Sequence, residues 1–351
     1  MRINKTLRVV LVAALAAGLW AGSANAQTQL KLNQVGAALA LPLVSGEGVV
    51  TYNTVTNVGP ADRNLHFNVI NGEGWDVTDF DCPVTASETV LIQFSGDGVN
   101  SQLTVECNFG SGLPEFVSRF FAGFSGGILF IANETHECKD GSCTTNENDL
   151  FGDAVVVNFG QGTAFSAGAI PFQGNDPLAP GVADRDYLFD NSEYSMFPAT
   201  LATNFIAPGQ NLGGVVTADL LLFVLDGRRG TGSQAALDIV FFDDEETPTS
   251  AHYEFDCFSI VSLEQINPNF NAGLLGSESG HLYMTVIDAD QNSNVHDNKF
   301  GNGNAIRVVG VHGWLLQSIN TGAVGAWGRT LAQGMIPQDL DGDDTPAFDG
   351  L

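Results

Sequence analysis

Residues 64–94 read NLHFNVINGEGWDVTDFDCPVTASETVLIQF, and residues 236–266 read ALDIVFFDDEETPTSAHYEFDCFSIVSLEQI. Both stretches begin with apolar side chains at alternate positions, cross a polar turn and reach the triplet Phe-Asp-Cys, ending at Cys82 and at Cys257. Alternation with a period of two places the apolar side chains on one face of a β-strand. The two stretches therefore predict a β-sheet module that occurs twice.

Three further pairs of short matches occur in the same order in both halves. They are Gly48–Thr51 with Gly214–Thr217, Gly152–Val155 with Gly303–Ile306, and Gln173–Gly174 with Gln333–Gly334. A shared order of several matches indicates an internal repeat better than any one match does. The first half is longer between its Phe-Asp-Cys triplet and Gly152, and this surplus contains Cys107, Cys138 and Cys143.

Many short alternating segments separated by Gly and Pro turns are typical of a β-sandwich. We expect an all-β protein made of two tandem immunoglobulin-like β-sandwich domains, each with its own core, after a cleaved signal peptide. The expected boundaries are residues 1–26 for the signal peptide, 27–174 for the first domain with its disulfide-bearing insertion, 175–182 for a linker, 183–335 for the second domain and 336–351 for an acidic tail. Only Pro114–Phe121 resembles a helix.

The N-terminal residues have the order of a secretory signal peptide. Arg2, Lys5 and Arg8 precede an apolar run that ends at Trp20, and the sequence Ala-Asn-Ala ends at Ala26. Cleavage after Ala26 is expected. The apolar run is shorter than the roughly 20 residues that span a bilayer. We therefore expect a secreted, periplasmic or cell-surface protein without membrane insertion after cleavage.

The chain is strongly acidic, with 40 acidic and 13 basic residues and a net charge of −27. Such a charge repels nucleic acids and anionic lipids. Such a charge is typical of a well-solvated surface. The alternative is that some of the acidic residues bind calcium.

The cysteines predict disulfides, because an exported chain folds in an oxidising compartment. We expect Cys82 to pair with Cys107 and Cys138 to pair with Cys143. The first bridge closes a loop that stabilises by about 3 kcal/mol on the chain-entropy model. Cys257 is left over, and is either a buried free thiol or half of an intermolecular bridge.

Two acidic loops have oxygen-bearing side chains at alternate positions, as the start of a calcium-binding EF-hand loop does. The candidate ligands are Asp288, Asp290 and Asn292 in one loop, and Asp339, Asp341 and Asp343 in the other. Ser293 and Lys299 stand where an EF-hand needs Gly and Glu, which excludes a complete EF-hand. Solvated acidic loops are the alternative.

No catalytic residue stands out in the sequence. Residues 123–127 read GFSGG and match the nucleophile elbow, but a strand-like run follows where that motif needs a helix. We interpret the pentapeptide as a glycine turn. The histidines are scattered, and Trp75, Trp314 and Trp327 suit a carbohydrate platform or core packing.

Residues 80–89 (FDCPVTASET) and 149–156 (DLFGDAVV) resemble segments of a loose group of exported, β-rich bacterial proteins of uncharacterised activity. The resemblance implies export and a β-rich fold, and it carries over neither an activity nor a functional residue.

We therefore expect a non-catalytic structural, adhesive or binding protein of the bacterial cell envelope or surface. The partners expected are other surface proteins, further copies of the chain or glycans, and nucleic acid is excluded. The alternative is an extracellular hydrolase of a polysaccharide or ester polymer, with its site where the two sandwiches meet. An exposed edge strand or apolar patch would favour assembly or adhesion.

Overall fold

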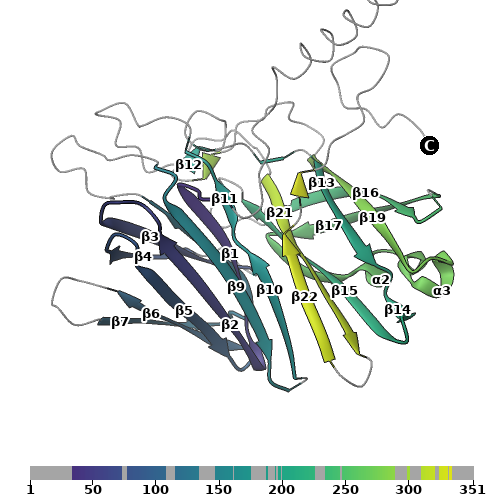
Figure 1. Cartoon of the computed structure of the whole chain (residues 1–351), viewed down its shortest axis with the longest axis horizontal. Helices are drawn as coiled ribbons and strands as arrows, with labels where there is room; N and C mark the ends of the chain where they lie inside the picture. Colours follow the sequence, from purple (N-terminus) through teal and green to yellow (C-terminus); the bar gives the residue numbers. More distant parts are fainter. Residues whose placement is uncertain are drawn as a thin grey trace, which may run out of the picture. The chain divides into compact units, whose positions relative to one another are not determined.

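The computed structural model of the 351-residue chain is all-β (Figure 1). It describes residues 34–72, 77–107, 115–133, 147–160, 162–174, 187–188, 194, 197–198, 200–225, 234–245, 247–288, 299–300, 310–320, 324–330 and 332–333. The predicted signal peptide, linker and acidic tail lie outside these ranges.

The first half contains two antiparallel sheets. In the β1 sheet the strand order is β11-β1-β8-β3-β4. Its strands are β1 (Ala38–Val44), β3 (Arg63–Asn71), β4 (Val77–Val84), β8 (Gly126–Ala132) and β11 (Ile170–Phe172). The β2 sheet has the order β10-β9-β2-β5-β6-β7. Its strands are β2 (Gly46–Asn57), β5 (Thr89–Gly96), β6 (Asn100–Cys107), β7 (Glu115–Ala122), β9 (Leu150–Asn158) and β10 (Thr163–Gly168).

The second half contains two further antiparallel sheets. The β13 sheet has the order β17-β16-β19-β13-β23, and its strands are β13 (Thr200–Ile206), β16 (Gln234–Asp243), β17 (Pro248–Asp256), β19 (Ser279–Asp288) and β23 (Ala332–Gln333). The β15 sheet has the order β14-β15-β21-β22, with β18 also paired to β15. Its strands are β14 (Gly209–Asn211), β15 (Gly214–Leu225), β18 (Phe258–Ser262), β21 (Gly310–Asn320) and β22 (Val324–Thr330). A short pair joins β12 (Tyr187–Leu188) to β20 (Lys299–Phe300).

The strand order of the first half recurs in the second. The series β11-β1-β8-β3-β4 corresponds to β23-β13-β19-β16-β17, and the series β10-β9-β2-β5 corresponds to β22-β21-β15-β18. The hairpins β3–β4 and β16–β17 contain the alternating apolar runs of residues 64–94 and 236–266, and the second strand of each hairpin leads to the Phe-Asp-Cys triplet. This correspondence agrees with the repeat that the sequence predicts.

The two halves differ after β5 and after β18, which are the strands that follow the β3–β4 and β16–β17 hairpins. In the first half β5 continues into the β6–β7 hairpin. In the second half β18 is followed by the helical segments α2 (Leu263–Ile266), η1 (Pro268–Phe270) and α3 (Ala272–Leu275). A capping box starts α2, because the Ser262 and Gln265 side chains each bond the other's backbone N–H.

Each pair of sheets encloses apolar side chains. The first core includes Leu41, Phe67, Phe94 and Leu103, which come from both the β1 and the β2 sheets. The second core includes residues of both the β13 and the β15 sheets. Its members include Leu201, Leu222, Phe241, Met284 and Leu315. Alternating residues of the strands in the two sheets fill each core.

A third apolar cluster, which we call the joining cluster, combines side chains of both halves. Phe130 and Phe172 come from the first half, and Phe223 and Trp314 from the second. The Trp314 indole nitrogen donates a hydrogen bond to the carbonyl oxygen of Gly168, at 2.9 Å. The sequence predicts two separate cores and gives no sign of this cluster.

Two glycines of the first half allow a close approach by Phe258 of β18. A Cβ atom on Gly72 would lie 2.8 Å from the Phe258 side chain, and one on Gly126 would lie 3.0 Å from its ring. Both distances are too short for carbon atoms in contact. Gly126 also belongs to the pentapeptide at residues 123–127 that resembles a nucleophile elbow. In the structure this glycine has a packing role.

Candidate interaction surface

The edge strand β7 was expected to be helical, and the structure corrects this prediction. Glu115–Ala122 is a strand that pairs with β6 in antiparallel register, with Phe116 opposite Glu106 and Phe120 opposite Gln102. Within the described ranges β7 is the last strand of the β2 sheet, next to β6 (Figure 1). Its Phe and Val residues favour a strand, and pairing to β6 satisfies one edge of its backbone.

Side chains of β7 alternate between the first core and the solvent. Val117 and Phe121 pack against the first core. Phe116 and Phe120 point the other way, with 68 % and 79 % of their surface exposed. The unpaired backbone N–H and C=O groups of an exposed edge strand offer a template for pairing with another chain, and exposed apolar side chains on that strand favour such pairing.

The outer face of β5, β6 and β7 is almost free of charge. We define the β7 patch by its outward residues, which are Leu91, Gln93, Ser95, Gln102, Thr104, Glu106, Phe116, Ser118 and Phe120. Among these side chains Glu106 is the one charged group. In a chain with a net charge of −27, such a neutral area is where another acidic surface is repelled least.

Arg119 is the basic residue of β7, and its side chain turns toward Phe80 of the first core. Its guanidinium lies 5.3 Å from the centre of the Phe80 ring, a cation–π distance. One of its nitrogens also donates a hydrogen bond to the Ser118 carbonyl oxygen at 3.2 Å. Arg119 therefore covers part of the edge without adding charge to the outer face.

A disulfide anchors the β6–β7 hairpin at the end where the connection from β6 to β7 begins. Cys82 of β4 and Cys107 of β6 are bonded, with their Cα atoms 5.3 Å apart, as the sequence predicts. The bond links the β1 sheet to the β2 sheet, and Cys107 lies opposite Glu115 at the start of β7. Both sulfur-bearing residues are buried.

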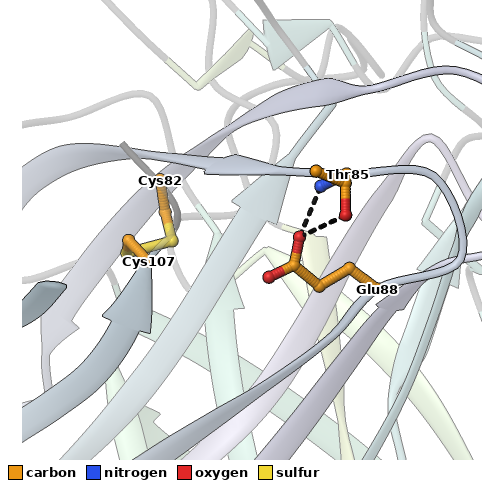
Figure 2. The surroundings of a disulfide bond; sticks show 4 residues. All are labelled: Cys82, Thr85, Glu88 and Cys107. Atoms are coloured by element: carbon orange, nitrogen blue, oxygen red, sulfur yellow. Dashed lines mark hydrogen bonds between the residues drawn. A yellow bond between two sulfur atoms is a disulfide. The ribbon is translucent and has the colours of Figure 1, made fainter. Parts of the chain in front are cut away.

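The turn between β4 and β5 is fastened beside this bridge (Figure 2). The Glu88 carboxylate accepts hydrogen bonds from the Thr85 backbone N–H at 2.5 Å and from the Thr85 hydroxyl at 2.7 Å. Ser87 in this turn has a φ of 62°, a left-handed conformation. The bridge and the turn together hold the strands that carry the β7 patch.

The predicted Cys138–Cys143 bridge falls outside the described residues. Cys257 is buried, with 2 % of its surface exposed, and its backbone has a φ of 51°. Its carbonyl oxygen accepts a hydrogen bond from the Val224 N–H at 2.7 Å.

The calcium-loop predictions remain untested by the structure. Asp288 is the last residue of β19. The other candidate ligands, Asp290, Asn292, Asp339, Asp341 and Asp343, fall outside the described residues. Within the described ranges, no group of three or more His, Cys, Asp or Glu side chains is placed to hold a metal ion.

Two histidines contact carboxylates. The Nδ1 atom of His66, on β3, lies 2.8 Å from an Asp81 oxygen, and its Nε2 atom lies 3.7 Å from an Asp79 oxygen. His252, on β17, contacts Asp238 at 2.8 Å and Glu254 at 3.1 Å. The hydrogen bond to Asp238 is the larger cause that raises the pKa of His252 above its ordinary value, and the hydrogen bond to Glu254 raises it further.

His312 is different because it is buried in β21, with 1 % of its surface exposed. Its Nδ1 atom accepts a hydrogen bond from the Gly313 N–H at 2.8 Å, and its Nε2 atom has no hydrogen-bond partner among the described residues. Burial lowers the pKa of His312 to about 4. His281 packs on Phe242, and His136 and His296 lie outside the described ranges.

The remaining sequence candidates belong to packing or lie outside the described part. Trp314 is fully buried in the joining cluster, so it is a core residue rather than a carbohydrate platform. Trp75 lies outside the described residues, and only the backbone of Trp327 is described. The GFSGG pentapeptide leads into β8, a strand, as expected.

Two comparisons with known proteins found no match for this chain. No protein-family model matches it, and a search of the curated proteins finds no significant match. Among the described residues, no helix is both long enough and apolar enough to cross a bilayer.

Proposed function

We propose that the protein is an exported, non-catalytic structural, adhesive or binding protein of the bacterial cell envelope or surface, and that it contacts its partner through the β7 patch. The observation that carries the proposal is the edge strand β7, with Phe116 and Phe120 exposed to solvent. Monomeric proteins usually protect such edges with charge, proline or a covering segment. An edge left with two exposed rings suits association.

The N-terminal sequence supports the export part of the proposal. A basic start, an apolar run and the Ala-Asn-Ala sequence ending at Ala26 are the features that direct secretion. The Cys82–Cys107 bridge also fits an oxidising compartment.

The strand order supports an immunoglobulin-like assignment for both halves. A constant-type immunoglobulin domain has strands A-B-E-D in one sheet and G-F-C in the other. The series β11-β1-β8-β3 and β10-β9-β2 follow this pattern, with β11 in the place of strand A. The series β23-β13-β19-β16 and β22-β21-β15 follow it again. We propose two tandem immunoglobulin-like sandwiches, the first extended by β4 to β7.

The proposal is tested by following the tagged full-length chain in the cells that produce it. A variant with Phe116→Ser and Phe120→Ser removes both exposed rings of the patch. Phe159→Ser is the matched control, because Phe159 is 64 % exposed and follows β9, away from this edge. We expect the native chain and the control to stay on the cell surface and the double variant to pass into the medium. Equal retention of all three chains would contradict the proposal.

A further inference from the structure

We infer that the partner of the β7 patch is a second copy of this chain, bound by antiparallel pairing of the two β7 strands about a two-fold axis at Ser118. The inference rests on the proposed function and names the partner of that surface. It would join the two β2 sheets into one continuous sheet across the dimer.

The sequence of β7 is self-complementary about Ser118. In a two-fold antiparallel pair centred there, Phe116 of each copy lies opposite Phe120 of the other, and Val117 lies opposite Arg119. Directly opposed residues on one sheet face are about 5 Å apart, and aromatic pairs at such positions stabilise a sheet. All four exposed rings of the two patches would then be covered in pairs.

Registers centred on the residues next to Ser118 pair these side chains less favourably. Centring the pair on Arg119 would place two guanidinium groups directly opposite each other, which is unfavourable. Centring it on Val117 would place each Phe116 ring opposite the small Ser118 side chain. It would therefore leave the phenylalanine rings unpaired with each other.

The charge distribution favours this surface for self-association. Each copy has a net charge of −27, so most approaches of two copies are repulsive. The β7 patch has one carboxylate, Glu106, among nine outward side chains, and its remaining groups are apolar or neutral. Two copies can meet here with little repulsion, and added salt should strengthen the pairing because it screens the rest of the surface.

The difference between the halves predicts a closed dimer. In the described part of the second half, α2, η1 and α3 follow β18 where the first half has the β6–β7 hairpin. The described part of the chain therefore presents one edge of the β7 type. A single self-complementary surface forms an isologous contact, which closes after two copies.

Disulfide trapping tests the register with the purified mature chain. Ser118→Cys would bring two new thiols face to face, within the Cα separation of about 4.4–6.8 Å that a disulfide accepts. Thr104→Cys is the matched control, because Thr104 lies opposite Ser118 one strand inward. Its two copies would be three strand spacings, about 14 Å, apart. We expect a covalent dimer with Ser118→Cys, and none with Thr104→Cys or with the unmodified chain. Trapping of Val117→Cys instead would overturn the register.

Sedimentation of the same protein between about 1 and 100 μM tests the dimer itself. We expect a reversible dimer that Phe116→Ser with Phe120→Ser weakens by about tenfold or more, while Phe159→Ser leaves it unchanged. A native chain that stays monomeric overturns the self-pairing. If that monomer is still retained on cells through Phe116 and Phe120, the proposed function stands. A dimer without such retention contradicts the proposed function alone.

Discussion

The buried histidine of β21 makes a quantitative prediction about acid stability. His312 has its imidazole enclosed beside Phe223, with ring centres 6.4 Å apart, and its Nε2 atom lacks a hydrogen-bond partner among the described residues. A protonated imidazole would be a buried cation there. We consider the substitution His312→Phe, which keeps an aromatic ring and removes the titrating group.

The magnitude follows from the pKa difference between the folded and unfolded chains. Burial lowers the pKa of His312 from an ordinary value of 6.5 to about 4. Above pH 6.5 the imidazole is neutral in both states and contributes no pH dependence. As the pH falls below 6.5, the unfolded state binds a proton that the folded state refuses, so the free energy of unfolding decreases. The difference of about 2.5 units amounts to a loss of about 3 kcal/mol by pH 4.

Chemical denaturation at pH 8 and at pH 4.5 measures this loss. At pH 4.5 the native chain should lose about 2.5 kcal/mol more than the His312→Phe variant. Asp153 and Asp219 have pKa values raised by burial, and they change stability in the opposite direction. They are present in both chains, so their effect cancels in the comparison. An equal decrease in both chains would refute the buried, neutral state of His312.

Three further outcomes are expected. Replacing Cys82 and Cys107 with alanine should lower the free energy of unfolding by about 3 kcal/mol, measured by denaturation beside the disulfide-bonded native chain, since the bridge closes a loop of 25 residues. Trp314→Phe should lower it by about 1 kcal/mol or more, because the hydrogen bond to Gly168 is lost; unchanged thermal melting would argue against that bond. Calcium should raise the melting temperature by several degrees over chelator if the loops that contain Asp288 and Asp339 bind it, and identical melting curves would exclude both sites.

The hairpin pattern was predictable because its physical signal is local. Leu65, Phe67 and Val69 alternate with polar residues, and the structure places them in the first core. The Phe-Asp-Cys triplets mark equivalent strands in the two halves. Within each hairpin, the period-two alternation and the position of the turn determine which strand face is buried. The Cys82–Cys107 bridge was predicted from the oxidising compartment that the N-terminal sequence indicates, and the structure confirms it.

The strand β7 was harder to predict because both of its faces are apolar. Phe116 and Phe120 face solvent while Val117 and Phe121 face the core, so hydrophobic periodicity does not distinguish a strand from a helix. The self-complementary edge became visible only once β6 fixed the register. The short helix α2 had a readable signal, because Ser262 and Gln265 have the spacing of a capping box.

The joining cluster could not be read from either repeat alone. Its members belong to neither the first nor the second core, and they occupy positions where an isolated half would carry polar groups. Trp314 and Phe223 look like ordinary core residues in the sequence, and nothing local indicates that their neighbours Phe130 and Phe172 come from the other half.

The close packing of Phe258 on Gly72 and Gly126 has a practical consequence for anyone who divides the polypeptide. A fragment that contains only one half would expose to water either the Phe258 ring or the surface at Gly72 and Gly126 on which it packs. Such fragments should aggregate even though each keeps its own apolar core. Recombinant work is therefore best planned on a chain that contains both halves, and a single half needs polar replacements at these positions first.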